Sequence, residues 1–112
     1  MSIQIGDKLP HFTAVKQDGT AFDSNSIQNK PVVIYFYPKD NTPGCTTQAC
    51  SFRDAYQDFQ DLGAEVIGVS SDSVSSHQNF QQKHKLPFIL LSDSDRKLRK
   101  LFGVPTALFG LI

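Results

Sequence analysis

The sequence predicts an α/β fold, in which helices flank a mostly parallel sheet, in one domain over residues 1–112. Stretches with the pattern of strands alternate along the chain with stretches of helical periodicity, as parallel sheets require. Residues 31–37, PVVIYFY, form a near-continuous apolar run that is typical of a strand buried on both faces. A long amphipathic helical pattern follows over residues 43–62. These two adjoining elements carry most of the prediction.

The first expected element is a β-hairpin that precedes the apolar strand. Residues 13–15 and 20–22 have the composition of short strands. Between them, Gln17, Asp18 and Gly19 have the composition of a turn. We therefore expect these two strands to pair with each other.

The helix expected over residues 43–62 has one apolar face and clear ends. Pro43 and Gly44 open it, and Gly63 supplies the stop. The apolar side chains recur at alternating spacings of four and three, which places them on one buried face. They are Cys45, Ala49, Phe52, Tyr56 and Phe59.

The next strand is expected over residues 64–70. A second helix should follow and run to about Lys85. Asp72 or Ser73 can cap its N-terminus, because a short oxygen-bearing side chain accepts hydrogen bonds from the first free N–H groups.

The last expected elements are a short strand over residues 88–91 and a helix that ends at Gly103. Asp93 or Ser94 can cap this helix. Val104-Pro105 follows, which is similar to the cis-proline site of thioredoxins, but the sequence leaves the isomer open.

Both cysteines of the chain fall near the start of the helix expected over residues 43–62. Cys45 lies in the first turn, where the positive end of the helix dipole and free backbone N–H groups favour a thiolate over a thiol. Cys45 is therefore a candidate nucleophile. The alternative is that it packs as a small buried hydrophobic side chain. Cys50, near the inner face, has the same alternative.

The spacing of Cys45 and Cys50 excludes a disulfide while the helix is intact. Residues five apart in an α-helix lie roughly 8–9 Å apart between Cα atoms and about 140° around the axis. A disulfide needs Cα atoms within about 7 Å. Either the two thiols are unrelated, or oxidation unwinds the first turns. The spacing also differs from the C-x-x-C pair of disulfide oxidoreductases, which suggests a cycle in which Cys45 reacts first and Cys50 later.

Pro38, Thr42 and Cys45 fit the pattern P-x-x-x-T-x-x-C at the junction between the strand and the helix. This pattern is the active-site signature of peroxiredoxins. The longer string YPKDNTPGCTTQACSFRD resembles the two-cysteine Q type, also called bacterioferritin comigratory protein. The resemblance covers essentially the whole chain, from IGDKLPHFTAVKQDGTAF to LRKLFGVPTALFG. It implies a thioredoxin-like fold.

The resemblance also implies an activity, that of a thiol peroxidase for hydrogen peroxide and organic hydroperoxides. Cys45 would be the peroxidatic cysteine and Cys50 the resolving cysteine, joined in an intramolecular Cys45–Cys50 disulfide that thioredoxin reduces. Thr42 would hydrogen-bond the thiolate and the peroxide, although it can also simply cap the helix. Pro38 would shield the thiolate from water, although it can also simply end the strand. No metal or organic cofactor is expected.

The chain ends earlier than the family it resembles. Members continue past GVPTALFGL with further strands and a final helix, and one of those strands carries an arginine that completes the active site. The sequence is therefore interpreted as a truncated peroxiredoxin. Arg53 lies about 12 Å along the helix axis from Cys45 and is a poor substitute. The strand at 31–37 would also lose a neighbour, and the exposed apolar edge would favour association.

Two other functions remain open at this point. One is a thiol–disulfide oxidoreductase of the thioredoxin class, against which the missing C-x-x-C argues. The other is an inactive fragment, or a redox-sensitive scaffold that only binds, which the missing arginine favours. Peroxide consumption coupled to thioredoxin and reduction of insulin would separate the three.

Charge and hydropathy exclude several classes of partner. Eleven basic and eleven acidic side chains cancel, so neither a nucleic acid nor a membrane surface is expected as a partner. The N-terminus has no apolar core of a signal peptide, and no segment approaches transmembrane length. A cytoplasmic, reducing location is expected, and an organelle is compatible with the sequence. The chain is expected to be a monomer.

The remaining charged side chains are interpreted as solvated. His77 and His84 are seven positions apart on a polar helix and are expected to face water rather than a metal ion. The basic run RKLRK, residues 96–100, is expected to form a solvated helix face. His11 is expected in a loop.

Overall fold

The computed structural model describes residues 9–27 and 30–104 of the chain. Their centre is a five-stranded sheet with the strand order β2-β1-β5-β4-β3. The strands are β1 (Thr13–Lys16), β2 (Ala21–Asp23), β3 (Val32–Phe36), β4 (Glu65–Ser70) and β5 (Ile89–Ser92). Each of them falls within about one residue of its predicted position.

The sheet is mixed, with a parallel half and an antiparallel half. Strands β3, β4 and β5 run parallel, because a helical segment connects each of them to the next. Strands β1 and β2 form the predicted hairpin, and β1 joins β5 in the antiparallel direction. The α/β fold class predicted from the sequence is confirmed, and the hairpin makes the sheet less parallel than expected.

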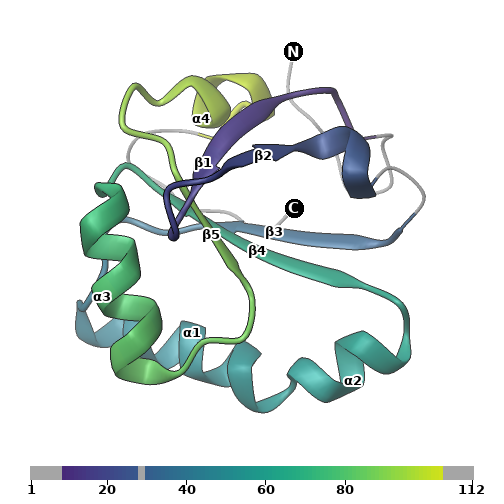
Figure 1. Ribbon diagram of the computed structural model, residues 1–112. Coiled ribbons are helices and arrows are strands. Elements are labelled where there is room, and N and C mark those ends of the chain that lie inside the picture. The colour runs from purple at the N-terminus through teal and green to yellow at the C-terminus, as the bar shows by residue number, and fades with distance from the viewer. Residues whose placement is uncertain (1–8, 28–29, 105–112) are drawn as a thin grey trace.

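Helices cover both faces of the sheet (Figure 1). They are the 3-10 helix η1 (Ser24–Ile27) and the α-helices α1 (Pro43–Asp54), α2 (Tyr56–Asp61), α3 (Val74–His84) and α4 (Lys97–Phe102). Helices α1, α2 and α3 lie on one face, and α4 lies on the other. Within the described residues, no helix has the length and apolar content needed to cross a bilayer.

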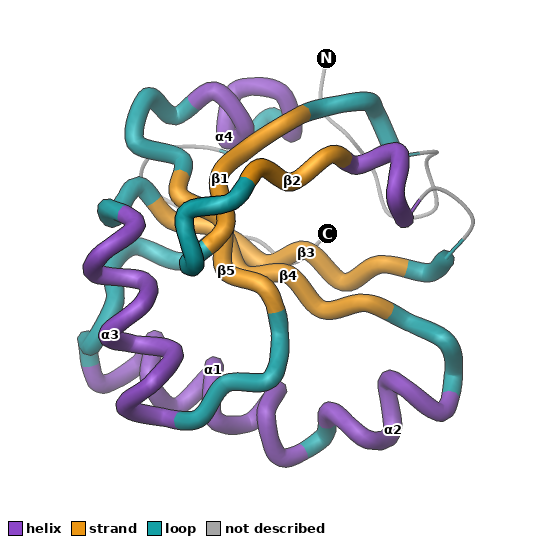
Figure 2. Tube along the Cα trace, in the orientation of Figure 1, coloured by secondary structure: helices purple, strands orange, loops and turns teal. Residues whose placement is uncertain are grey.

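One long helix was predicted over residues 43–62, and the structure divides it at Ala55 (Figure 2). The backbone of Ala55 has φ −92° and ψ 2°, so the helical path opens for one residue. Neither glycine nor proline marks this position. Beyond the break, the Tyr56 ring lies 6.4 Å from the Phe88 ring, and the Phe59 ring lies 6.0 Å from the Phe52 ring. Tertiary packing of these rings accompanies a break that local sequence does not signal.

The caps of the later helices agree in part with the prediction. Ser73 caps α3 and accepts a hydrogen bond from the N–H of Ser76. Asp93 also accepts from the first turn of α4, through the N–H groups of Leu98 and Arg99. Helix α4 nevertheless starts later than expected, because Arg96 adopts a left-handed conformation with φ 60° just before it.

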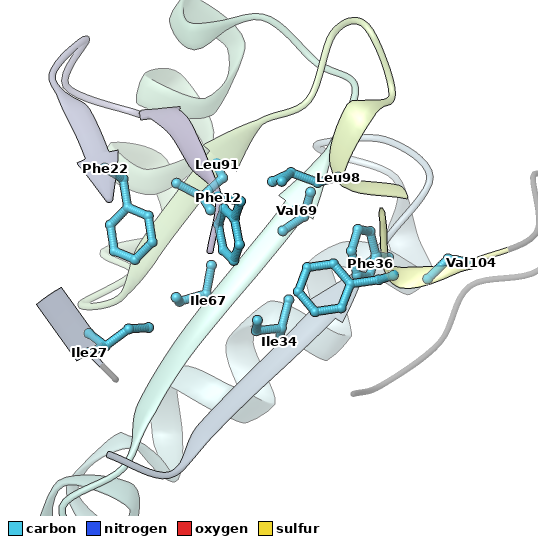
Figure 3. Close-up of a cluster of buried hydrophobic side chains, with 11 residues drawn as sticks. Phe12, Phe22, Ile27, Ile34, Phe36, Ile67, Val69, Leu91, Leu98 and Val104 are labelled. Atoms are coloured by element: carbon cyan, nitrogen blue, oxygen red, sulfur yellow. The ribbon is translucent and has the colours of Figure 1, made fainter. Parts of the chain in front are cut away.

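The side chains of β3 alternate between two cores. On the α4 face, a cluster of eleven buried residues joins the sheet to η1, the hairpin and α4 (Figure 3). Its members are Phe12, Phe22, Ile27, Ile34, Phe36, Ile67, Val69, Leu91, Leu98, Phe102 and Val104. On the other face, a second cluster joins the sheet to α1 and α3. Its buried members are Tyr35, Tyr37, Cys45, Ala49, Val66, Phe80, Leu86, Phe88 and Leu90.

Two expectations about the surface need correction or limits. The basic run over residues 96–100 is not a uniformly solvated face, because Leu98 and Arg99 are buried at 2% and 9% exposure. This follows from Asp93, which holds the first turn of α4 against the sheet.

Within the described residues β3 is an edge strand, as predicted, but both its faces are covered. Pro105, whose isomer the sequence leaves open, lies outside the described residues.

Candidate active site at the start of α1

The thiol of Cys45 lies in the first turn of α1, as the sequence predicts. Thr42 is the N-cap, Pro43 is the first helical residue, and the first helical hydrogen bond runs from the N–H of Thr46 to the carbonyl of Thr42. The N–H groups of Gly44 and Cys45 precede that bond and have no intrahelical acceptor. Cys45 is 7% exposed. The sulfur therefore combines burial with the positive end of a helix.

Cys50 lies in the same unbroken helix and is half-buried. Both cysteines are free thiols. Because α1 is continuous from Pro43 to Asp54, it has the geometry that keeps residues five apart from bonding. A Cys45–Cys50 disulfide therefore requires that α1 unwind between them.

The other two predicted site residues, Thr42 and Pro38, lie on the loop before α1. Thr42 is the N-cap residue, but its side chain makes no capping hydrogen bond. Its hydroxyl instead donates to the carbonyl of Lys39 at 3.2 Å. Pro38 is exposed at the beginning of the loop. The structure thus brings Pro38, Thr42 and Cys45 onto one loop-helix junction.

Asp40, in the middle of that loop, is buried in a hydrogen-bond network that the sequence did not predict. Its carboxylate accepts from the Tyr37 hydroxyl at 2.6 Å, from the Ser76 hydroxyl at 2.8 Å and from His77 Nδ1 at 2.6 Å. Its backbone N–H donates to Asp72 Oδ2 at 2.7 Å. The loop that leads to Cys45 is therefore tied to α3 and to the end of β4.

His77 was expected to be solvated, and this was wrong. Its side chain is 0% exposed, and that of Asp40 is 1% exposed. The cost of burying the His77 ring is offset by Asp40, which is 37 positions away in the chain. The polar pattern of α3 alone therefore led to the wrong expectation. Nε2 of His77 lies 2.9 Å from the carbonyl oxygen of Leu91, which can only accept. Both ring nitrogens thus face acceptors, and both hydrogen bonds form at once only when each nitrogen carries a proton.

The carboxyl group of Asp40 is held in its charged form. Burial alone raises the pKa of Asp40, but hydrogen bonds from His77, Tyr37 and Ser76 outweigh it and hold the pKa below its ordinary value of 3.8. Burial, followed by the nearby charge of Asp40, raises the pKa of Tyr37 far above its ordinary value. Tyr37 is therefore a permanent donor to Asp40.

The same groups are the candidate metal ligands among the described residues. Asp40, Asp72 and His77 place one ligand atom each within 4.8 Å of one another. However, the carboxylate of Asp40 already has three hydrogen-bond partners, and one of them is His77 Nδ1 at 2.6 Å. Asp72 Oδ2 accepts from the N–H of Asp40 and from the Ser70 hydroxyl. These contacts already engage the ligand atoms of Asp40 and His77 and one oxygen of Asp72 within the protein.

Arg53 is engaged with α3 and with its neighbour in α1. Its Nη1 donates to the carbonyl of His84 at 2.8 Å, and its Nε donates to Asp54 at 3.1 Å. His84 itself is half-buried rather than solvated, with its ring edge against Phe80 at 5.2 Å. Arg53 thus links the last turn of α1 to the last residue of α3.

Tyr35 lies under α1 with a hydroxyl that has no hydrogen-bond partner among the described residues. Its ring stacks on Phe52 at 4.7 Å and crosses β4 at Gly68, where a Cβ atom would lie 2.9 Å from the hydroxyl oxygen and from Leu90. Any larger residue at position 68 would therefore require the Tyr35 or Leu90 side chain to shift. Burial is the main reason that the pKa of Tyr35 lies above its ordinary value, with smaller effects of Asp40, Cys45 and Cys50.

Replacement of Tyr35 by phenylalanine is expected to stabilise the fold by about 1 kcal/mol, because a buried hydroxyl without a partner costs about 1–3 kcal/mol. Tyr37→Phe is the matched control. It removes a hydroxyl that donates to a carboxylate, and it should destabilise the fold by about 1.5–3 kcal/mol. Urea unfolding of both variants measures these changes. Equal losses in the two variants would show that the Tyr35 hydroxyl has a partner.

The comparisons with known proteins agree with this geometry. The model of the AhpC/TSA family matches residues 5–111. Chloroplastic peroxiredoxin Q of Oryza sativa subsp. japonica is 54% identical over 107 residues, which are 96% of this chain and 49% of that protein. A putative peroxiredoxin bcp of Coxiella burnetii is 47% identical over 104 residues, 93% of this chain and 69% of that protein.

Solved structures show the same fold. The crystal structure of a cysteine-to-serine mutant of PrxQ from Xylella fastidiosa aligns with a TM-score of 0.86 and 40% identity, over 93% of this chain and 68% of that chain. Peroxidoxin BcpB from Mycobacterium tuberculosis aligns with a TM-score of 0.84 and 36% identity, over 88% of this chain and 65% of that chain. The thioredoxin-like fold expected from the sequence is confirmed.

The chain belongs to the AhpC/TSA family, and within it to the group of peroxiredoxin Q and bcp proteins. It spans about half the length of the plant relatives that it matches.

Proposed function

We propose that this protein is a thiol peroxidase that reduces hydrogen peroxide and organic hydroperoxides, with Cys45 as the peroxidatic cysteine and Cys50 as the resolving cysteine. The observation that carries the proposal is the position of Cys45, which is buried in the first turn of α1 beside N–H groups without intrahelical acceptors. Its relatives' names, peroxiredoxin Q and peroxiredoxin bcp, support the same reaction.

The first half-reaction oxidises Cys45. The thiolate sulfur attacks one oxygen of the hydroperoxide, the O–O bond breaks, and the second oxygen leaves as water or an alcohol after it takes up a proton. The sulfur loses two electrons and becomes a sulfenic acid. The N–H groups at the start of α1 stabilise the negative charge that develops on the leaving oxygen. The Thr42 hydroxyl orients the incoming peroxide, and Pro38 limits the access of water.

The second half-reaction restores the thiols. After α1 unwinds, the Cys50 sulfur attacks the sulfenic sulfur of Cys45, the S–O bond breaks, and water leaves as the disulfide forms. A dithiol protein of the thioredoxin type then exchanges with the disulfide and supplies two electrons and two protons. Neither a metal ion nor an organic cofactor takes part in the proposed cycle. We expect the protein to act in a reducing compartment of the cell. This is the cytoplasm or, as in the relatives named chloroplastic, a plastid.

Peroxide treatment tests the order of the two cysteines. One equivalent of peroxide is expected to convert the reduced wild type to an intramolecular Cys45–Cys50 disulfide, detected by peptide mass spectrometry. In Cys50→Ser, the resolving thiol is missing, so the same treatment should leave a sulfenic acid on Cys45 that dimedone traps. If dimedone trapped a sulfenic acid on Cys50 before Cys45 in the wild type, the proposed roles would be reversed.

A reductase assay separates the proposal from its alternatives. A thiol–disulfide oxidoreductase would reduce insulin disulfides, and a fragment without catalysis would consume peroxide no faster than free cysteine. The proposed peroxidase should consume peroxide in a thioredoxin-coupled assay and leave insulin unreduced. The monomeric state stays a prediction, which sedimentation of the reduced chain would measure.

A further inference from the structure

Helix α3 is attached to both ends of the segment that carries the two cysteines. Helices α1 and α3 lie on the same face of the sheet (Figure 1), and a hydrogen bond from Arg53 to His84 joins them. His77, in the first half of α3, bonds to Asp40 before α1, and the carbonyl of His84, the last residue of α3, bonds to Arg53 near the end of α1. Cys45 and Cys50 lie between these two attachments.

The first attachment, at Asp40, is strong and buried. The carboxylate of Asp40 pairs with His77 at 2.6 Å, with both side chains out of contact with water. The backbone N–H of Asp40 is also committed, to Asp72 at 2.7 Å. Release of Asp40 would leave a charge without its partner in a buried site, which is unfavourable.

The second attachment is formed by Phe52, which packs against the sheet, and Arg53, which bonds to α3. The Phe52 ring stacks on Tyr35 at a centroid distance of 4.7 Å and 23° between planes. The guanidinium of Arg53 donates to the carbonyl of His84 at 2.8 Å. This carbonyl belongs to a helix C-terminus, where a cation is favoured by the helix dipole.

The segment between the two attachments packs Cys45 and Ala49 into the core, while its polar side chains make local contacts. Asn41 has the left-handed φ of 63°, a conformation that asparagine adopts more readily than most other non-glycine residues. The Thr42 side chain bonds only to the carbonyl of Lys39, and the Thr47 hydroxyl bonds back to the carbonyl of Pro43. These local hydrogen bonds are lost together when the first turns of α1 open, whereas the bonds of Asp40 and Arg53 to α3 lie outside those turns.

We propose that Asp40 and Arg53, held by α3, are positioning residues that confine the unwinding of α1 to residues 41–51. This inference rests on the Cys45–Cys50 disulfide of the proposed function and adds the limits of the conformational change. With both ends fixed, Cys50 stays close to Cys45 after the helix opens, and the strand β3 and the second half of the helical region keep their places. His77 contributes through Asp40, whose carboxylate lies 2.6 Å from its Nδ1.

Backbone hydrogen exchange of the full chain, reduced and oxidised with diamide, tests these limits. Diamide takes two electrons and two protons from the two thiols and forms the disulfide without peroxide, so the test does not depend on peroxidase activity. In the oxidised wild type, protection should be lost at Thr46 and its neighbours in α1. It should remain at Tyr37 and Asp40 on one side, and at Asp58 and Phe59 on the other.

Two variants should move these limits in opposite directions. In oxidised Asp40→Asn, loss of protection should spread backward to positions 37 and 40, with exchange faster on the order of tenfold. In oxidised Arg53→Met, it should spread forward to Asp58 and Phe59 by a similar factor. Arg53→Lys, which keeps a cationic donor, should restore part of the protection.

Asp93→Asn is the matched control. Asp93 is also a buried carboxylate, 4% exposed, that holds a loop to a helix, but it serves α4 on the other face of the sheet. Its replacement should lower global stability and leave the limits of unwinding unchanged.

Three results would overturn the inference. One is loss of protection at Tyr37 and Asp40 together with Thr46 in the oxidised wild type. Another is that, on oxidation, Asp40→Asn and Arg53→Met both lose exchange protection at the same amides as the wild type. The third is failure of diamide to form the disulfide at all. If diamide forms the disulfide within these limits but peroxide does not oxidise Cys45, the inference stands and the proposed peroxidase function fails.

Discussion

Cys45→Ser is expected to lower thioredoxin-coupled peroxide consumption by about 10⁴-fold, in the range that loss of a catalytic nucleophile causes. The variant keeps a side chain of nearly the same shape at a 7% exposed position, so the fold should be retained. A serine hydroxyl offers no comparable anion to attack the peroxide, because the helix start favours a thiolate far more readily than an alkoxide. The rate of NADPH oxidation through thioredoxin reductase and thioredoxin measures the loss.

Cys50→Ser is the matched control for this experiment. It changes the same atom five residues later in the same helix, at a half-buried position. Because it spares the first half-reaction, each chain should still reduce one equivalent of peroxide at the wild-type rate, and only turnover should stop. If Cys45→Ser retained the first turnover while Cys50→Ser lost it, the proposed roles would be reversed.

The parts of the molecule that the sequence predicted are those that neighbouring residues determine. The apolar run before Pro38 forms β3, and Pro43 opens α1 with Cys45 in its first turn. The cap of α3 at Ser73 is likewise a matter of residues within one turn. The junction that carries the candidate site is therefore readable from about ten consecutive residues.

The parts that the sequence did not predict depend on contacts between distant residues. Asp40 and His77 are 37 positions apart in the chain, and each alone has the appearance of a surface residue. A carboxylate four positions after the end of a buried strand was the available signal for Asp40. The break at Ala55 has no local signal, since it accompanies the packing of Tyr56 and Phe59 against rings from other elements.

His77→Leu is expected to lower the free energy of unfolding by about 3–5 kcal/mol, the usual cost of removing one partner of a buried ion pair. Leucine has a similar volume, but it leaves the carboxylate of Asp40 without its Nδ1 partner and the carbonyl of Leu91 without any donor from this side chain. In urea unfolding, the midpoint should fall by about 2 M for a domain of this size. A loss of that size is a large part of the stability of a small domain.

The pairing of Asp40 with His77 is tested by a double-mutant cycle. Asp40→Asn removes the charge that His77 compensates, so the loss in the Asp40→Asn/His77→Leu variant should be smaller than the sum of the two single losses. Additive losses would mean that the two side chains are stabilised by other partners. Tyr37 and Ser76 are those partners for Asp40, and Leu91 is the one for His77.

The pH dependence gives the same pair a second test with a definite sign. Because its hydrogen bonds hold the pKa of Asp40 below the ordinary value of 3.8, the charged carboxylate contributes stability that is fully present above that pH. The contribution is lost as the pH falls through the lower pKa of the folded state. The difference in stability between the wild type and Asp40→Asn should therefore be constant near neutrality and narrow in acid below pH 3.8. A difference that grew on acidification would require a raised pKa, and it would contradict an ion pair in which His77 donates to a charged Asp40.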